Sequence, residues 1–324
     1  MRTVLLLVAY LLCVFCLPAQ KMYDSLLEKG IEYHDARQYN QAIGIYKEIL
    51  QQDSTIVEAI YELSLSLLES GRYEEAISCC DKLIDRDDKY AILGYNTKGS
   101  SLNYMGKTNE AISVYLEGID RYDDFPQLYY NLGLAYFADK DYVKAGEAYR
   151  KTLKMNPKHA GAHLNLGRTM AAMDKRIEGL LGLYYFLLLE PASDRSEWAF
   201  EWIQEMFYGQ DLSDSDYSDA DSKLLALLNA NESSIKPKDT TFDLFLKDTK
   251  SFLSALDEIE ETTNPAEATV WDNYISFFKA LSMRGYAESF GYYISTPLRT
   301  EAEGWHKKNK NRLTNFARWL AQQE

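Results

Sequence analysis

Three aspartates, Asp214, Asp216 and Asp219, lie close together in a polar segment and could contribute ligands to a calcium ion. An EF-hand-type loop needs glycine at its sixth position and glutamate at its twelfth. Counted from Asp214, those positions hold Asp219 and Leu225, so the calcium pattern fails. We favour the alternative, a solvated acidic loop over residues 209–221.

His159 and His163 stand four residues apart, a spacing at which two imidazoles on one helix can bind zinc. An adjacent glutamate of the metalloprotease type is missing, and a boundary between two predicted helical units falls between the histidines. We therefore interpret His163 as a side chain packed between helices. The sequence predicts no metal site and no cofactor.

Other catalytic patterns are missing from the sequence as well. The chain contains neither a glycine-rich phosphate loop nor a nucleophile elbow. Its carboxylates are scattered, so their spacing identifies no acid–base pair. We expect a protein that is not an enzyme, and a hydrolase activity would have to lie in the C-terminal third.

The charge balance argues against a nucleic-acid partner. The 324 residues include 49 Asp and Glu against 35 Lys and Arg, for a formal net charge of −14, whereas nucleic-acid binders bring a basic face to the phosphates. Cys79 and Cys80 are adjacent and poorly placed to bond to each other. We interpret Cys80 as a small packed hydrophobe, with a redox-sensitive thiol as the alternative.

The N-terminal residues have the layout of a signal peptide. Arg2 precedes an uncharged apolar run at 4–17, and Ala19 offers a small residue for cleavage. We predict a signal peptide at 1–19, export to the periplasm or the cell exterior, and no stable membrane insertion after cleavage. An uncleaved anchor is the alternative. Neither Cys13 nor Cys16 has the small residues before it that a lipoprotein signal needs.

Small residues recur at a nearly constant interval along the first part of the chain. One stretch contains, in order, Tyr129, Leu132, Gly133, Tyr136, Ala145, Tyr149 and Pro157. A first small position recurs at intervals of 34 or 35 residues, at Gly30, Ser64, Gly99, Gly133 and Gly167. A second repeats the same intervals, at Ala42, Ala76, Ala111, Ala145 and Gly179.

These residues and spacings resemble the tetratricopeptide repeat, in which each unit is a pair of antiparallel helices. The small positions let the two helix backbones approach, and units stack because a lone pair cannot bury its apolar face. We predict an all-α superhelical solenoid of the exported bacterial type. Its five helix pairs occupy 23–193, with units at 23–56, 57–90, 92–125, 126–159 and 160–193.

Residues 194–324 are predicted to form an irregular α-helical region in which the repeat period has stopped. Apolar residues at helical spacing predict helices at 195–208, 224–228, 242–259, 265–294 and from about 300 onward, with a bend near Gly285 or Gly291. This region is either a cap that closes the solenoid or a continuation of it by irregular helix pairs.

The final predicted helix combines basic and aromatic residues, namely Trp305, Lys307, Lys308, Lys310, Arg312, Phe316, Arg318 and Trp319. A basic amphipathic helix with tryptophan can lie on an anionic membrane surface. We favour the alternative, a terminal helix packed on its neighbours with a solvated basic face.

The resemblance implies that the first helix of each unit lines a concave groove. Its exposed positions are expected at Leu27, Ile31, Tyr61, Leu65, Asn96, Tyr130, Asn131, Leu134, Phe137, Asn165 and Arg168. Leu27, Leu93 and Thr97 stand where a carboxylate clamp of the family wants Lys or Arg, so a chaperone-tail clamp is not expected.

We expect Tyr130 and Phe137 to anchor a bound peptide and Asn131 and Asn165 to fix its backbone. In the alternative, the C-terminal helices fold back and fill the groove. The predicted function is an exported scaffold or adaptor that binds a protein or peptide segment. The alternatives are a soluble structural subunit of an envelope-assembly or transport complex, a glycan-binding protein and a hydrolase.

Overall fold

The structure is a computed structural model that describes residues 22–86, 88–208, 219–260 and 269–323. All regular elements within these described residues are helices, as predicted. The chain divides into two compact units, which we call unit 1 and unit 2 and describe separately; the division falls between Lys140 and Asp141. The predicted signal segment at 1–19 lies outside the described residues.

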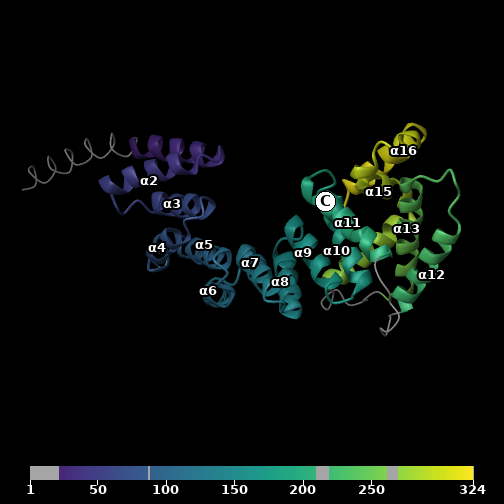
Figure 1. Cartoon of the computed structure of the whole chain (residues 1–324), viewed down its shortest axis with the longest axis horizontal. Coiled ribbons are helices and arrows are strands. Elements are labelled where there is room, and N and C mark those ends of the chain that lie inside the picture. Colours follow the sequence, from purple (N-terminus) through teal and green to yellow (C-terminus); the bar gives the residue numbers. More distant parts are fainter. Residues whose placement is uncertain (1–21, 87, 209–218, 261–268, 324) are drawn as a thin grey trace, which may run out of the picture. The chain divides into compact units, whose positions relative to one another are not determined.

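Unit 1 is a series of helices joined by short turns (Figure 1). Helical residues 22–35 come first. They are followed by α2 (Tyr39–Gln52), α3 (Val57–Glu69), α4 (Tyr73–Ile84), α5 (Ala91–Tyr104), α6 (Thr108–Arg121) and α7 (Pro126–Ala138). Each helix packs against the next, and α5 also contacts both α3 and α7. The first helices of successive repeats therefore form one layer, which we call the first-helix layer: residues 22–35, α3, α5 and α7.

Glycine and tyrosine pairs explain why the helices of one repeat pack so closely. A Cβ atom added to Gly30 would lie 2.4 Å from Cε1 of Tyr46, and one added to Gly99 would lie 2.4 Å from Cε1 of Tyr115. Both rings are fully buried. The glycine of the first helix thus leaves the space that the tyrosine of the second helix occupies. The small residues at the matching positions, such as Ala111, are also fully buried.

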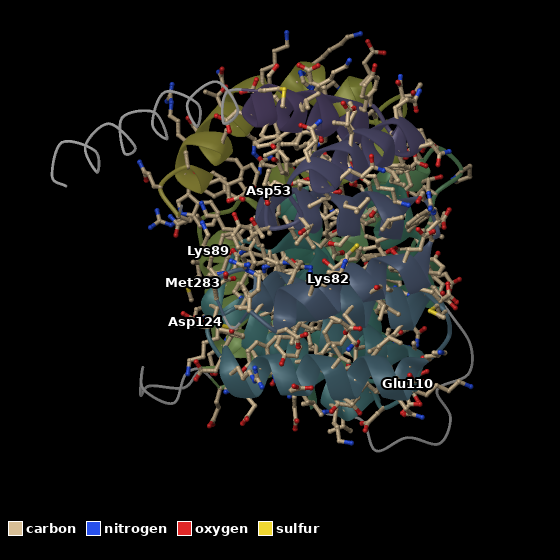
Figure 2. All side chains as sticks on the ribbon, turned by 90° about the vertical axis from the view of Figure 1, so that its left-hand side faces the viewer. Asp53, Lys82, Lys89, Glu110, Asp124 and Met283 are labelled. Atoms are coloured by element: carbon tan, nitrogen blue, oxygen red, sulfur yellow. The ribbon has the colours of Figure 1, made fainter. Side chains whose placement is uncertain are left out.

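The turn between the two helices of a repeat uses the left-handed backbone region each time. Positive φ angles occur at Arg37 (58°), Gly71 (77°), Gly106 (75°), Lys140 (64°) and Asp174 (57°). These positions follow the same 34- or 35-residue interval as the small residues, which shows that the tight turn is part of the repeat. The turns that lead from one repeat to the next carry charged side chains, and Figure 2 shows Lys89 and Asp124 at the edge of unit 1.

Unit 2 contains the remaining helices. They are α8 (Tyr142–Met155), α9 (Ala160–Ala171), α10 (Arg176–Leu189), α11 (Asp194–Tyr208), α12 (Asp219–Ser233), α13 (Thr241–Ala255), α14 (Val270–Met283), α15 (Ala287–Ile294) and α16 (Glu303–Leu320). Short 3-10 turns lie at Leu256–Glu258 and Thr296–Leu298.

The centre of unit 2 is α10, the second helix of the last predicted repeat. It contacts α9 on one side and α11, α14 and α15 on others, so nearly all of its residues are buried. The Tyr184 ring lies 4.8 Å from the Phe252 ring and 5.5 Å from the Phe290 ring, and its hydroxyl lies 3.2 Å from Oγ1 of Thr249. Since a stack of repeats leaves its last helix pair uncovered, the C-terminal helices act as a cap.

Several predicted element boundaries differ from the structure. The acidic segment becomes helical at Asp219, so α12 is longer than the predicted 224–228. The stretch at 265–294 is two helices, because Gly285 takes a φ of +72° between α14 and α15. Gly291, by contrast, lies inside α15.

Candidate functional site

The first-helix layer of unit 1 holds most of the predicted groove residues. These side chains are neither fully buried nor fully exposed, and they lie on residues 22–35, α3, α5 and α7: Leu27, Ile31, Tyr61, Leu65, Asn96, Tyr130, Leu134 and Phe137. Buried side chains of the same helices, such as Leu63 in α3 and Leu132 in α7, pack these helices into their repeats. The unit thus carries a row of half-buried apolar and tyrosine side chains on rigid helices.

Polar side chains cross-link successive helices of this layer. Nδ1 of His34 lies 2.8 Å from Oγ of Ser66 in α3. The Asn131 amide nitrogen in α7 donates to Oδ1 of Asn96 in α5 over 2.8 Å, and Oδ1 of Asn131 accepts from Nε2 of Gln127 over 3.2 Å. Asn131 is only 9% exposed, so the prediction that it would be an exposed groove residue is wrong.

The sequence analysis missed two members of this network, Gln127 and Ser100. Gln127 lies four residues before Asn131, and Ser100 lies four residues after Asn96, so each shares a helix face with its asparagine. Oγ of Ser100 lies 3.1 Å from the Tyr115 hydroxyl and 3.4 Å from the Asn131 amide nitrogen. The four-residue spacing was the available signal for both.

Carboxylates dominate the charge of the same layer. Its helices contain the acidic residues Asp24, Glu28, Glu32, Asp35, Glu58, Glu62 and Glu69 against Lys29 and Lys98. Lys98 pairs at 2.6 Å with Asp81 of α4, a second helix. Burial raises the pKa of the Glu62 carboxyl, and the nearby Asp35 carboxylate raises it further. A cation at this place would relieve that repulsion.

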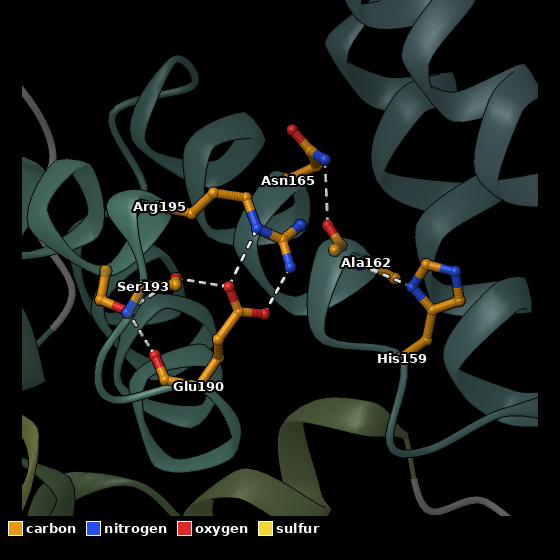
Figure 3. Close-up of polar contacts among 8 residues, drawn as sticks. His159, Ala162, Asn165, Glu190, Ser193 and Arg195 are labelled. Atoms are coloured by element: carbon orange, nitrogen blue, oxygen red, sulfur yellow. Dashed lines mark hydrogen bonds and ion pairs between the residues drawn. The ribbon is translucent and has the colours of Figure 1, made fainter. Parts of the chain in front are cut away.

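The two predicted groove residues of unit 2 are enclosed by their own unit. Asn165 is 6% exposed, and its amide nitrogen donates to the backbone oxygen of Gly161 over 2.9 Å (Figure 3). Its Oδ1 accepts from Nη1 of Arg168 over 3.0 Å. The Arg168 guanidinium lies 4.7 Å from the centre of the Trp202 ring on α11. The prediction that Asn165 would be exposed for a peptide backbone is therefore wrong, because its side chain is buried and its amide is hydrogen-bonded within α9.

A cluster of polar side chains connects the start of α11 to the end of α10. The Glu190 carboxylate accepts from Nε of Arg195 over 3.1 Å and from the Ser193 hydroxyl over 2.5 Å (Figure 3). Burial raises the pKa of Glu190, but the hydrogen bonds from Arg195 and Ser193 outweigh it and leave the pKa lowered. These contacts join the C-terminal end of α10 to the first turn of α11.

The two histidines considered for zinc have structural partners. Nδ1 of His159 accepts from the backbone nitrogen of Ala162 over 3.1 Å and caps the start of α9 (Figure 3). Nε2 of His163 lies 2.8 Å from the backbone oxygen of Pro157, and its Nδ1 contacts the hydroxyl of Tyr274. Within the described residues, no group of three or more candidate side chains is arranged to hold a metal ion.

The remaining residues considered in the sequence analysis lie in the acidic segment, at Cys80 and on α16. Asp214 and Asp216 lie outside the described residues. Cys80 is fully buried, which raises the pKa of its thiol to about 12 and supports its interpretation as a packed hydrophobe.

The final helix α16 packs its aromatic side chains inside the protein. Trp319 and Phe316 are buried, so they are not available to contact a membrane surface. No helix in the described part of the chain combines the length and apolar content of a membrane span.

Comparison with known proteins identifies the repeats. Family models for the tetratricopeptide repeat match residues 33–93 and 126–159. The peroxisomal targeting signal receptor of Kluyveromyces lactis is 20% identical over 210 residues, which cover 64% of this chain and 36% of that protein. Hsp70-Hsp90 organizing protein 1 of Glycine max is 24% identical over 200 residues, which cover 51% and 35%. The matched region spans about a third of the length of these relatives.

Two solved structures of tetratricopeptide-repeat proteins show partial similarity to this chain. One from Thermus thermophilus is 18% identical, with a TM-score of 0.48 over 57% of this chain and 98% of the other. YrrB, a repeat protein with an unusual peptide-binding site, is 17% identical, with a TM-score of 0.42 over 55% and 90%. From its repeat pattern, its helix pairs and the matched repeat models, this chain is a tetratricopeptide-repeat protein.

Proposed function

We propose that this chain is an interaction protein and that the first-helix layer of unit 1 binds a segment of a protein partner. The observation that carries the proposal is the row of half-buried apolar and tyrosine side chains on α3, α5 and α7. Tyrosine provides contact area at low entropic cost and keeps a polar tip. Helix-pair repeats of this kind present extended binding surfaces. The names of two relatives, a targeting-signal receptor and a chaperone organizing protein, agree with an interaction role.

The chemistry of the layer indicates a partner segment with apolar and basic side chains. Apolar side chains of the partner would pack on Leu65, Tyr130 and Leu134, and a basic side chain would meet Asp35 and Glu62. Asn96 would supply a backbone contact through its amide nitrogen, because its Oδ1 already accepts from Asn131 and its side chain is half-buried. Among the described residues, no acceptor takes a hydrogen bond from that amide nitrogen.

Export is the second part of the proposal and rests on the residue pattern at 1–19. A chain expressed in a bacterial host should be recovered outside the cytoplasm with Gln20 at or near its new N-terminus. Intact mass and N-terminal sequencing of the recovered protein measure this. Full-length protein in the membrane fraction would instead support the uncleaved anchor.

The binding proposal is tested with two variants that introduce the same charge. Random peptides displayed on phage are selected on the full-length protein, and the selected peptides are titrated by fluorescence anisotropy. Leu134→Glu changes the first-helix layer, whereas Leu116→Glu changes a side chain of α6 that is 45% exposed. We expect peptides rich in apolar and basic residues, affinity weakened about tenfold or more by Leu134→Glu, and no change with Leu116→Glu. Equal effects of the two variants, or no enriched peptide, would contradict the proposal.

A further inference from the structure

A cleft of about 560 Å³ lies in unit 2 between the repeat helices α8 and α10 and the cap helix α14. Its inner surface is apolar and aromatic, with contributions from Leu153, Tyr185, Val270 and Tyr274. Leu153 and Tyr274 are buried, so they form the floor. The volume falls in the range of about 300–1,000 Å³ that is typical of ligand sites. The cleft shares no residue with the first-helix layer of unit 1.

One wall of this cleft is cationic. Arg150, Lys151 and Lys154 line it from α8, together with the single acid Glu147. Among the residues that the structure describes, no carboxylate forms an ion pair with any of the three cations. The wall therefore has a formal charge of +2 in a chain whose net charge is −14. Such a local reversal of sign attracts anions to the cleft.

The opposite wall is neutral and polar. Thr269 and Asn273 line it from the start of α14, and both side chains are exposed. The Thr269 hydroxyl caps the start of α14 and donates to Asp272 over 2.7 Å, so the Asn273 amide is the group that can exchange hydrogen bonds with a peptide backbone. The cleft thus combines an apolar floor, a cationic wall and a hydrogen-bonding wall.

We propose that this cleft binds an acidic peptide segment in which carboxylates alternate with apolar side chains. The spacing of the cations supports this occupant. Arg150 and Lys154 are four residues apart on α8, so their Cα atoms are separated by about 6 Å along the helix axis. In an extended peptide, side chains two positions apart lie on one face at about 6.7 Å. Two carboxylates of such a segment would face α8, while the apolar side chains between them would face the floor.

The probe for this proposal is a fluorescein-labelled peptide of alternating glutamate and leucine, titrated against the full-length protein by anisotropy. A peptide with glutamine in place of glutamate shows what the charge contributes. The first variant is the double reversal Lys151→Glu with Lys154→Glu. Its matched control is Lys308→Glu with Lys310→Glu, which makes the same change of net charge at two exposed positions of α16. Asn273→Trp obstructs the cleft mouth without changing a charge.

We expect saturable binding of the glutamate peptide that weakens as salt is added, and much weaker binding of the glutamine peptide. The Lys151 and Lys154 double variant and Asn273→Trp should each weaken binding about tenfold or more, and the α16 control should stay within about twofold. Circular dichroism melts verify that each variant is folded. Equal loss in both double variants, or equal binding of both peptides, overturns the proposal.

Two further results complete the test. Leu134→Glu in unit 1 should leave this binding unchanged, so failure of the first-helix proposal and failure of the cleft proposal are distinguishable. Displacement of a bound fluorescent fatty acid, with no binding of the glutamate peptide, would make the occupant a small amphiphilic anion and overturn the peptide assignment.

Discussion

The hydroxyl of Tyr274 in α14 hydrogen-bonds to Nδ1 of His163 in α9, although the two residues are 111 positions apart in sequence. Nε2 of His163 faces a backbone oxygen, that of Pro157, which can only accept, so Nε2 carries the ring proton and donates it. Nδ1 is therefore the acceptor and Tyr274 the donor. This bond joins the last predicted repeat to the cap helices of unit 2.

Acid should destabilise unit 2 through His163. Burial lowers the pKa of this imidazole to about 4, whereas the unfolded side chain keeps a value near 6.5. Because the unfolded state binds the proton at a higher pH than the folded state, the contribution of His163 to the free energy of unfolding is fully present above pH 6.5. It is lost as the pH falls toward 4. The loss is on the order of 3 kcal/mol. Urea unfolding followed by tryptophan fluorescence measures it, since all five tryptophans lie in unit 2.

The control for this pH dependence is a histidine of unit 1. Between pH 6.5 and 4, the free energy of unfolding should depend less on pH in His163→Phe than in the unmodified protein. In His34→Gln the pH dependence should be unchanged. An unchanged slope in His163→Phe would show that other groups cause the acid sensitivity.

Removal of the Tyr274 hydroxyl should weaken the attachment of the cap. Tyr274→Phe leaves Nδ1 of His163 as a buried acceptor without its donor, at a cost of about 1–3 kcal/mol. Tyr104→Phe is the matched control, because that side chain is 69% exposed and should change stability by less than about 0.5 kcal/mol. Urea midpoints of both variants test this, and identical midpoints would count against a structural role for the bond.

Two helical glycines of unit 1 should respond to alanine in opposite directions. Gly99→Ala places a Cβ atom against the Tyr115 ring and should cost about 1–3 kcal/mol through overpacking. A Cβ atom on Gly44 in α2 meets nothing within 4 Å, so Gly44→Ala should stabilise the helix by about 0.5–1 kcal/mol. Thermal melts by circular dichroism compare them. A stabilised Gly99→Ala would refute the close approach of α5 and α6.

The left-handed turns provide a second pair of opposite effects. Arg37 has a φ of 58°, which costs a side-chain-bearing residue about 1–2 kcal/mol, so Arg37→Gly should raise the melting temperature. Gly106 has a φ of 75° and open space around its missing Cβ, so Gly106→Ala should lower it by strain in the backbone alone. If the melting temperatures of both variants shift in the same direction, the left-handed turn conformation is not the cause of the change in stability.

The sequence alone determined the repeat part of the fold. Gly30 with Tyr46 and Gly99 with Tyr115 are partners that lie about sixteen residues apart, so each repeat contains its own packing contacts and the pattern recurs at a constant interval. The turns at Gly71 and Gly106 recur at the same interval, because they too depend on residues close together in sequence. It also explains why α11 and the long apolar helix α13 were predicted from their spacing.

Only the tertiary structure decided which polar residues are available to a partner. Asn131 and Asn165 occupy equivalent repeat positions that the family pattern places in a groove, yet one is bonded to Asn96 of the preceding repeat and the other is buried and bonded within α9. The Tyr274 contact with His163 and the cationic cleft on α8 likewise join segments that are far apart in sequence. Such contacts follow no period, because they depend on how the cap helices pack against α10, and no spacing within one helix encodes that packing.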